Sequence, residues 1–224
     1  MNSEISFLEK VDAFVKIKRI IYLSTKRIFD ILVSLIGLLV LIPIAIFVKT
    51  AYMLSGDFHS VIFVQDRIGK DGKHFKFFKF RSMVPNADEI LFKALAEDEK
   101  LREEYSMNKK LKNDPRITKV GKLIRKLSID ELPQMINIFL GDMSLIGNRP
   151  YLPREQKDMG QYYEDIIKTK PGLTGWWQVS GRSNVTFLQR CKLEQYYSNH
   201  AGFKIDIQIF FKTFKVVIFG KGAE

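Results

Sequence analysis

The stretch ILVSLIGLLVLIPIAIFV, residues 31–48, has eighteen residues without a charge in a chain of 224. That length is at the threshold for a helix that crosses the hydrocarbon core of a bilayer. Pro43 lies inside the run, and a proline removes a backbone hydrogen bond and kinks or breaks a helix. The sequence therefore predicts a membrane-embedded helix that is broken at Pro43.

Basic residues flank this apolar run on both sides. Those before it are Lys10, Lys16, Lys18, Arg19, Lys26 and Arg27, and those after it are Lys49, Arg67, Lys70, Lys73, Lys76, Lys79 and Arg81. Lys and Arg collect on the cytoplasmic side of a membrane, so both flanks are expected there, which favours a re-entrant helix. A simple spanning helix stays open, because long soluble domains escape this charge rule.

The C-terminal part of the chain carries a second apolar pattern. Ile207, Phe210, Phe211, Phe214, Val217 and Ile218 recur at helical spacing, with Lys204, Lys212, Lys215 and Lys221 around them. This pattern is typical of a helix that lies in the membrane interface with lysines at the headgroups. An ordinary helix packed on a protein core fits the pattern equally well.

The overall composition points to an anionic partner and a reducing compartment. The formal charge is +11, which favours nucleic acid, an acidic membrane surface or phosphorylated substrates. Cys191 is the single cysteine, so an internal disulfide is excluded. With three histidines and one cysteine the sequence has no zinc-type ligand cluster, and it has no P-loop or dinucleotide fingerprint.

The middle of the chain predicts a β-hairpin followed by a helix. Residues 61–64 are typical of a buried strand, Asp71-Gly72 of a hairpin turn, and residues 74–81 of the partner strand. That second strand interleaves Phe with Lys and Arg. This pattern fits a platform for single-stranded nucleic acid, and it equally fits a half-buried strand whose polar edge meets phosphates or only water. Residues 86–112 predict one amphipathic helix, opened by a capping box from Asn86 to Glu89.

The run SIDELPQ, residues 128–134, places two adjacent carboxylates, Asp130 and Glu131, where a helix is expected to begin. Pro133 is tolerated only in a first helical turn, and Ser128 with Glu131 matches a capping box. A helix N-terminus favours anions and their metal counter-ions. The pair is either a helix cap or a catalytic site.

Two loops rich in glycine and proline follow this carboxylate pair. Residues 141–150 hold Arg149 in a specified turn, which suits a guanidinium that grips a phosphate. Residues 170–182 contain two tryptophans with Gln178 and Arg182, a set that can pack a nucleotide or a core.

Many motifs in this order resemble those of the bacterial sugar transferases, the monotopic polyprenyl-phosphate phosphoglycosyl transferases. The matching motifs, over about two hundred residues, are KRxxD at 26–30, QxRxG at 65–69, KFRSM at 79–83, DPRIT at 114–118, LSIDELPQ at 127–134, GDMS at 141–144 and the block at 170–182. The resemblance implies transfer of a sugar 1-phosphate from a UDP-sugar to undecaprenyl phosphate, with release of UMP.

The resemblance also implies roles for particular residues. Asp130 would be the nucleophile that forms a covalent phosphosugar intermediate, and Glu131 would bind Mg²⁺. Fixed positive charge around the phosphates is expected from Arg149, Lys79, Arg81 and Arg116, with Gln178 and Arg182 as further substrate-binding residues. Asp206 would be a second metal ligand or a helix-positioning residue.

The expected fold is therefore α+β, with a mostly helical cytosolic domain, a small β-hairpin and interfacial amphipathic helices. The expected parts are a basic N-terminal helix or tail at 1–25, a re-entrant membrane helix at 26–55 and a catalytic domain at 56–224 with a C-terminal interfacial helix. The predicted location is the cytoplasmic face of the bacterial inner membrane, in contact with its lipids and without a nucleic-acid partner. A homodimer is left open.

The sequence departs from the family pattern at two positions. Ile42 precedes Pro43 where relatives usually have serine, so the bend angle of the membrane helix is open. Asn148 stands where proline is usual, which predicts a less rigid loop around Arg149. The alternatives to an enzyme are a scaffold of a polysaccharide assembly complex and a membrane-tethered nucleic-acid-binding module. Galactose or glucose is favoured over N-acetylated sugars.

Overall fold

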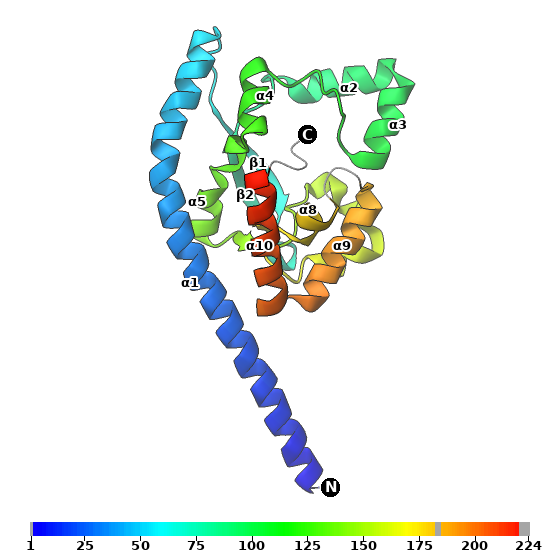
Figure 1. Ribbon diagram of the computed structural model, residues 1–224. Helices are drawn as coiled ribbons and strands as arrows, with labels where there is room; N and C mark the ends of the chain where they lie inside the picture. Colours follow the sequence, from blue (N-terminus) through cyan, green and yellow to red (C-terminus); the bar gives the residue numbers. More distant parts are fainter. Residues whose placement is uncertain (1, 182–184, 220–224) are drawn as a thin grey trace.

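The longest element of the computed structural model is helix α1, Asn2–Leu54, which lies along one flank of the molecule and extends beyond it at the N-terminal end (Figure 1). The structure describes residues 2–181 and 185–219, with side chains at 12–181 and 185–215. Within these residues, one helix is long and apolar enough to cross a membrane by length and composition. It is the part of α1 from Asp12 to Leu54, which contains an 18-residue window with a mean hydropathy of 3.1.

The predicted break at Pro43 is not present, because α1 continues as a helix through this residue. Pro43 lies on the exposed side of α1, and its φ angle suits a helix, so only one backbone hydrogen bond is lost. On the opposite side, Leu41, Ile44 and Val48 pack on the domain. These contacts on both sides of the proline hold the helix in one piece.

A stripe of polar side chains docks the first half of α1 on the domain. The spacing of Tyr22, Lys26, Asp30 and Ser34 is four residues, so they share one face, and Asp30 and Ser34 are buried there. Asp30 accepts hydrogen bonds from the Ser144 hydroxyl and the Leu145 backbone N–H. The predicted tail and membrane helix are therefore parts of one helix that contacts the domain.

The predicted β-hairpin is confirmed. Strands β1 (Ile62–Ile68) and β2 (His74–Phe80) pair antiparallel, joined by a turn in which Asp71 and Gly72 have positive φ angles of 55° and 75°. The first strand is not buried as predicted, since Phe63 and Val64 are exposed. Its burial is instead at Ile68, where the hairpin meets the core around Tyr151.

The single helix predicted at 86–112 is two helices, α2 (Ala87–Glu97) and α3 (Glu99–Asn108). Asp98 between them has an extended backbone, and its carboxylate caps α3 by accepting from the N–H groups of Lys100 and Leu101. The expected capping bond of Asn86 is absent from α2. Asp98 is thus an N-cap within the amphipathic stretch, and it divides that stretch into two helices.

The rest of the domain is built of short elements around a second small sheet. Helices α4 (Lys119–Lys126) and α5 (Gln134–Leu140) pack against α1, and strands β3 (Ser144–Ile146) and β4 (Gly172–Thr174) pair in parallel. The remaining elements are α6 (Gln156–Met159), α7 (Tyr163–Ile166), α8 (Trp176–Ser180), α9 (Phe187–His200), α10 (Phe203–Phe219) and four 3₁₀ turns.

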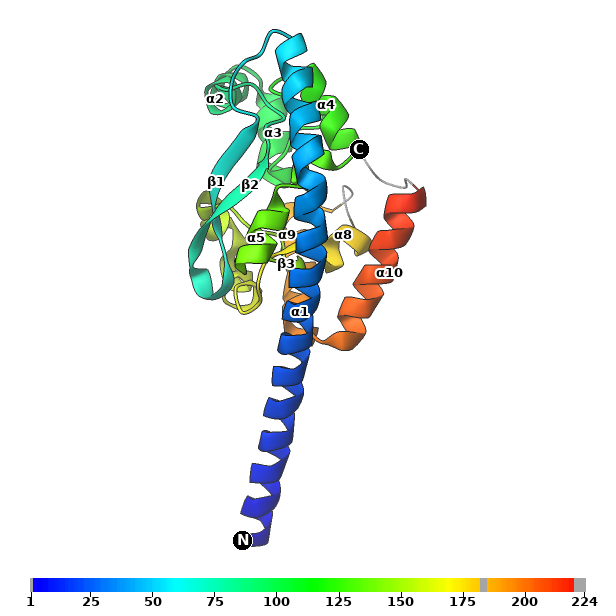
Figure 2. The ribbon, with the colours of Figure 1, turned by 90° about the vertical axis from the view of Figure 1, so that its left-hand side faces the viewer.

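Helix α10 lies beside α1, and it packs on the domain with one face and exposes apolar side chains on another (Figure 2). Ile205 and Ile209 are buried in the domain, whereas Ile207, Phe211 and Phe214 are exposed. Edge-to-face ring pairs join the helices, Tyr22 with Phe203 and Phe29 with Phe210. The exposed apolar side chains of α1 and α10 thus form one surface, called here the α1–α10 face.

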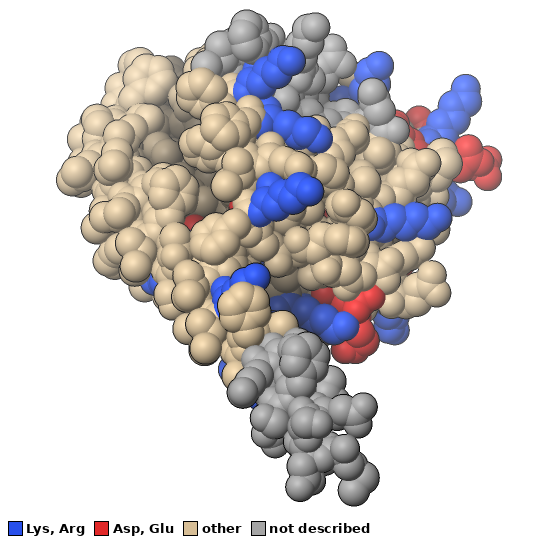
Figure 3. Space-filling view, turned by 60° about the horizontal axis from the view of Figure 1, so that its bottom comes forward, with Lys and Arg blue, Asp and Glu red and all other residues tan. Residues whose placement is uncertain are grey.

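Figure 3 views the molecule from the N-terminal end of α1, and most of the visible surface is neither basic nor acidic. The charged side chains that stand out of it are mainly Lys and Arg. On α1 the exposed apolar residues include Leu32, Leu35, Ile36, Leu39, Ile42 and Ile46. An exposed apolar surface of this extent marks an interaction site with a membrane or another protein.

Candidate functional site

Asp130 and Glu131 lie in a 3₁₀ turn, Ile129–Glu131, between α4 and α5. The predicted capping box is absent, because Ser128 adopts a left-handed backbone with φ 55° and its side chain makes no capping bond. Helix α5 begins only at Gln134, after Pro133. The carboxylates are therefore held by a sharp turn rather than at an α-helix N-terminus.

Lys79 of β2 is the cation next to this pair, with its ammonium nitrogen 3.6 Å from a carboxylate oxygen of Asp130. Asp130 is buried. Burial and the adjacent Asp130 raise the pKa of Glu131, while Lys79, Arg149 and Arg125 act against that rise. Burial lowers the pKa of Lys79, and both acids oppose this. Two neighbouring carboxylates thus share a site with several cations.

Arg125 on α4 is a cation of this site that the sequence analysis did not single out. It donates from Nε to the Ser82 hydroxyl at 2.8 Å, directly after β2. Its positive charge lowers the pKa of Glu131 and that of Lys79. No motif in the sequence separates Arg125 from the other basic residues of α4.

Arg149 reaches the pair from a loop that is packed tightly against the segment before β4. A Cβ atom on Gly147 would lie 2.3 Å from the Lys170 carbonyl oxygen, and one on Gly172 would lie 2.1 Å from the Gly147 nitrogen. Only glycine allows backbones this close. The Arg149 backbone N–H also donates to the buried Glu194 carboxylate at 2.9 Å.

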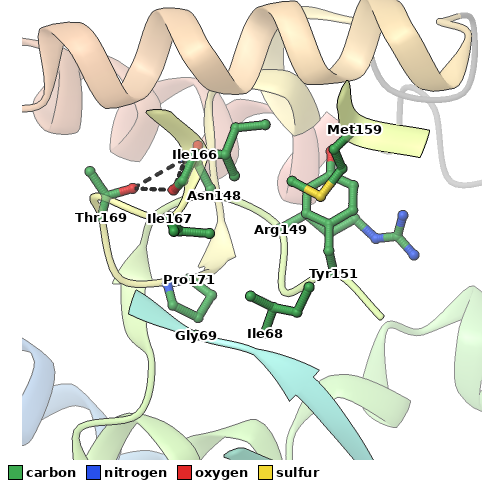
Figure 4. Close-up of a pocket in the computed structure, with 10 residues that line it drawn as sticks. All are labelled: Ile68, Gly69, Asn148, Arg149, Tyr151, Met159, Ile166, Ile167, Thr169 and Pro171. Atoms are coloured by element: carbon green, nitrogen blue, oxygen red, sulfur yellow. Dashed lines mark hydrogen bonds between the residues drawn. The ribbon is translucent and has the colours of Figure 1, made fainter. Parts of the chain in front are cut away.

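The expectation of a less rigid loop at Asn148 is wrong. The buried Asn148 side chain donates to the Ile166 carbonyl at 3.1 Å, to Thr169 at 3.1 Å and to Ser198 at 2.6 Å (Figure 4). The amide replaces the stiffness of a proline ring with hydrogen bonds. The cavity beside it holds about 10 Å³, room for about one water, and Arg149 points away from it (Figure 4).

Arg81 and Arg116, predicted to grip phosphates, are instead paired with acids of their own. Arg81 donates twice to Asp57 at 2.9 Å and also to the carbonyls of Ser60 and Met83. Arg116 forms a two-point pair with Asp114 at 2.8 and 2.7 Å. Both arginines are buried, and their guanidinium groups join neighbouring segments of the chain through these hydrogen bonds.

Asp206 is surrounded by donors rather than placed with other acids. One of its oxygens accepts from the Tyr22 hydroxyl at 2.9 Å and the Lys26 ammonium at 2.5 Å, and the other from the Tyr197 hydroxyl at 2.9 Å. These contacts join α1, α9 and α10. Of the two predicted roles, the contacts fit helix positioning.

Gln178 lies half-buried on α8, which packs on α9 and α10, and its amide oxygen is close to Gly175. Arg182 lies outside the described residues. The structure therefore brings Asp130, Glu131, Lys79 and Arg149 together, with Arg125 added to them. It does not bring Arg81, Arg116 or Asp206 into that group.

The carboxylate pair fits the way in which Mg²⁺ is usually bound. Mg²⁺ takes one or two protein carboxylates and completes its shell with water and substrate phosphates. Among the described residues, no group of three or more His, Cys, Asp or Glu forms an all-protein metal site. Two adjacent acids, of which Glu131 has a raised pKa, are a donor set that a divalent cation would stabilise.

Comparison with known proteins gives a family match across most of the chain. The family model described as bacterial sugar transferase matches residues 21–220. The undecaprenyl-phosphate galactose phosphotransferase of Salmonella typhimurium is 44% identical over 201 residues, 88% of this chain and 41% of the relative. The chain thus spans about two fifths of the length of that relative.

Two further relatives differ in length. The exopolysaccharide production protein ExoY of Sinorhizobium fredii is 37% identical over 199 residues, which are 89% of this chain and 88% of the relative. The undecaprenyl-phosphate glucose phosphotransferase of Komagataeibacter xylinus is 34% identical over 210 residues, 88% of this chain and 36% of the relative. The part of this chain that the family model matches contains Asp130, Glu131, Lys79, Arg125 and Arg149.

Proposed function

The chain belongs to the bacterial sugar transferase family, and from that premise we propose that it transfers a sugar 1-phosphate from a UDP-sugar to undecaprenyl phosphate. The observation that carries this proposal is the adjacent pair of buried Asp130 and exposed Glu131, with Lys79 at 3.6 Å from Asp130 and with Arg149 and Arg125 acting electrostatically on Glu131. Carboxylates of this kind serve as nucleophiles and metal ligands in phosphoryl transfer.

In the first step, a carboxylate oxygen of Asp130 attacks the phosphorus that carries the sugar. The bond from this phosphorus to the bridging oxygen of the diphosphate breaks, and UMP leaves with that electron pair. Asp130 then holds the sugar phosphate as an acyl phosphate. Lys79 and Arg149 are fixed cations that stabilise the charge on the transferred group.

In the second step, an oxygen of undecaprenyl phosphate attacks the same phosphorus and the Asp130 carboxylate leaves. The products are undecaprenyl diphosphate-linked sugar and UMP, so all atoms are accounted for. Division into two displacements keeps two anionic substrates from having to approach each other directly. Glu131 would hold Mg²⁺, which when bound would neutralise the diphosphate and the leaving UMP.

The α1–α10 face is the surface that we propose lies in the membrane. Its exposed residues are apolar, and lysines surround it on α10. The domain contacts α1 at Tyr22 and Asp30 before the apolar run and at Tyr52 after it. A domain that touches both ends of the run argues that both ends lie on one side of the membrane, the cytoplasmic side.

Labelling of engineered cysteines tests this placement. Lys18→Cys and Thr50→Cys lie on the two sides of the apolar run, and both positions are exposed. In intact cells, a thiol reagent that does not cross the inner membrane should label neither, and both should react after lysis. Reaction of one position alone in intact cells would contradict the placement. The unsubstituted chain is the control, since Cys191 is buried.

The proposed donor sugar is a hexose. Relatives that cover most of this chain are named for galactose and for glucose. Purified protein in detergent, given undecaprenyl phosphate, should release UMP faster from UDP-galactose or UDP-glucose than from UDP-N-acetylglucosamine. A preference for the N-acetylated donor would contradict the hexose assignment.

Magnesium-dependent release of UMP is the experiment that tests the function itself. Release should need the UDP-sugar and Mg²⁺, and radiolabelled sugar should enter the lipid phase when undecaprenyl phosphate is added. Absence of release with every donor in the panel would favour a scaffold. Salt-dependent binding to single-stranded nucleic acid at physiological ionic strength would favour the nucleic-acid-binding alternative.

A further inference from the structure

Four basic side chains gather on the side of the carboxylate pair that faces α9. They are Arg67 of β1, Lys110 after α3, Arg149 after β3 and Arg190 of α9, called here the basic cluster. Burial lowers the pKa of Arg190 and of Lys110, and the neighbouring Arg149 lowers both further. The members are thus close enough to repel one another, and Arg67 and Arg190 among them are buried.

Arg190 lacks the partner that a buried guanidinium requires. Its residue is 4% exposed, and among the described residues its side chain has no hydrogen bond or ion pair, with Nε fully buried. The guanidinium lies over the Trp177 ring, 4.7 Å from the ring centre, which fixes its plane. An unpaired buried charge is strongly unfavourable unless a ligand completes it.

Arg149 is also incompletely paired. Its Nη1 atom is buried without a hydrogen bond, and the nearest carboxylate oxygen, on Glu155, is 3.7 Å away. Arg67 differs, because it donates to the Pro150 carbonyl and to Gln65, each at 2.9 Å. Arg149 and Arg190 are therefore the members of the cluster with buried N–H groups that could donate hydrogen bonds to a ligand.

The acids near the cluster do not neutralise it. Glu194 is 1% exposed, and burial raises its pKa to about 8, so it is largely uncharged at pH 7. One of its oxygens accepts from the Arg149 backbone, and the other is unpartnered. Glu155 and Glu104 remain as two negative charges against four positive ones. The excess of positive charge calls for an anion.

The position of the cluster indicates which anion. The positive charge of Arg149 lowers the pKa of Glu131, so the cluster adjoins the carboxylate pair. Helices α3 and α9 lie on the side of the domain away from α1, whereas α4 with Arg125 packs beside α1 (Figure 1). A lipid substrate arrives at the α1–α10 face, so a water-soluble substrate is the one to occupy the α9 side.

We propose that Arg190 and Lys110, together with Arg149, bind the nucleotide phosphate of the nucleoside-diphosphate donor. This inference rests on the proposed function and adds two binding residues to it. Guanidinium forks bind phosphate oxygens in pairs, and Lys110 adds a point charge. The polyprenyl phosphate, the other source of a phosphate, would bind on the side of Arg125.

Binding measurements test the proposal without turnover. The full-length chain with Asp130→Asn, in detergent, is titrated calorimetrically with UDP and separately with farnesyl phosphate. Arg190→Gln in this background should weaken UDP binding at least tenfold and leave farnesyl phosphate binding unchanged. Arg190→Lys should recover part of the loss. The matched control is Lys112→Gln, an exposed neighbour of Lys110 that should bind UDP normally.

Unchanged UDP affinity in Arg190→Gln, or loss of farnesyl phosphate binding alone, would overturn the inference. If Arg190→Gln does not fold, Lys110→Gln replaces it, with an expected loss of three- to tenfold for UDP. UMP release by the wild-type chain is measured separately. If the Arg190→Gln chain releases UMP with the wild-type KM for the UDP-sugar, this inference is overturned and the proposed function is not. UDP binding through Arg190 without any UMP release overturns the proposed function alone.

Discussion

Buried or half-buried arginines occur in two regions of this molecule, and their donor groups are satisfied in opposite ways. Near the hairpin, Arg81 and Arg116 each form a two-point ion pair, with Asp57 and Asp114. Near α9, Arg149 and Arg190 keep buried donor atoms without partners. Nothing in the sequence distinguishes the arginines that pair with an acid from those that do not.

The difference separates structure from ligand binding. A buried arginine whose donors are filled by the protein holds two segments together, and its charge is already balanced. A buried arginine with open donors adds an unfavourable charge to the folded state, which a bound anion removes. The carboxylate pair adjoins the second region, and the variants below test whether the two regions are distinct.

The largest expected effect is on chemistry at the carboxylate pair. Asp130→Asn removes the proposed nucleophile, so UMP release should fall at least about a thousandfold, or about 4 kcal/mol in activation free energy. Release is measured with UDP-hexose, Mg²⁺ and undecaprenyl phosphate.

Asp66→Asn is the matched control for this variant. Asp66 is an exposed β1 residue paired with Lys76, and its loss should leave the rate within about twofold. Full turnover by Asp130→Asn would remove Asp130 from the mechanism and leave the pair a structural turn.

The next largest effect is on stability in the paired region. Arg81→Met leaves Asp57 without its partner and removes four hydrogen bonds, so the free energy of unfolding should fall by about 3 kcal/mol. Thermal unfolding in detergent measures this change. The folded molecules should keep the KM of the wild type for the UDP-sugar.

Arg149→Met provides the opposite case in the same comparison. It should lower UMP release about a hundredfold with a small change in melting temperature, since its side chain is incompletely paired. A raised KM with unchanged stability in Arg81→Met would show that the paired region also binds substrate.

The sequence predicts the elements whose signals are local. The hairpin follows from Asp71-Gly72, and the faces of α10 follow from its helical period. The carboxylate pair is also visible as an adjacent Asp130-Glu131. These features need only a few neighbouring residues to be specified.

The pairing of Arg81 and the position of Arg190 are not local, which is why they were not predicted, whereas Arg116 pairs with Asp114 only two residues away. Asp57 lies 24 residues from Arg81, and Arg190 reaches the site from a helix near the end of the chain. Nothing in the order of residues indicates which basic side chain meets an acid. The same holds for Pro43, where contacts with the domain outweigh the tendency of proline to break a helix.

A smaller effect is expected where α1, α9 and α10 meet. Asp206→Asn weakens hydrogen bonds from Tyr22, Lys26 and Tyr197, and charged hydrogen bonds of this kind contribute about 2 kcal/mol. The melting temperature should fall, and the Mg²⁺ concentration for half-maximal UMP release should not change.

Tyr22→Phe removes one of these donors and should give a smaller fall of the same kind. A shifted Mg²⁺ dependence in Asp206→Asn with unchanged stability would return Asp206 to the metal site.

The smallest effect concerns Glu194, which joins the unpaired region to the loop of Arg149. Its pKa is about 8 in the folded chain and near 4.5 when unfolded, so the folded state holds its proton over this interval. Stability therefore falls as the pH rises from about 4.5 to 8, because the unfolded state gives up the proton first. Glu194→Gln cannot titrate and still accepts the Arg149 N–H, so its free energy of unfolding should fall less than that of the wild type as the pH rises from 5 to 8.

Melting curves of both chains at pH 5, 6, 7 and 8, without nucleotide, measure this difference. Glu164→Gln, which removes an exposed acid, should run parallel to the wild type across the same range. A Glu194→Gln curve that is also parallel to the wild type would mean that Glu194 is ionised in the folded chain. The carboxylate would then balance Arg190, and the contrast between paired and unpaired arginines would no longer hold at α9.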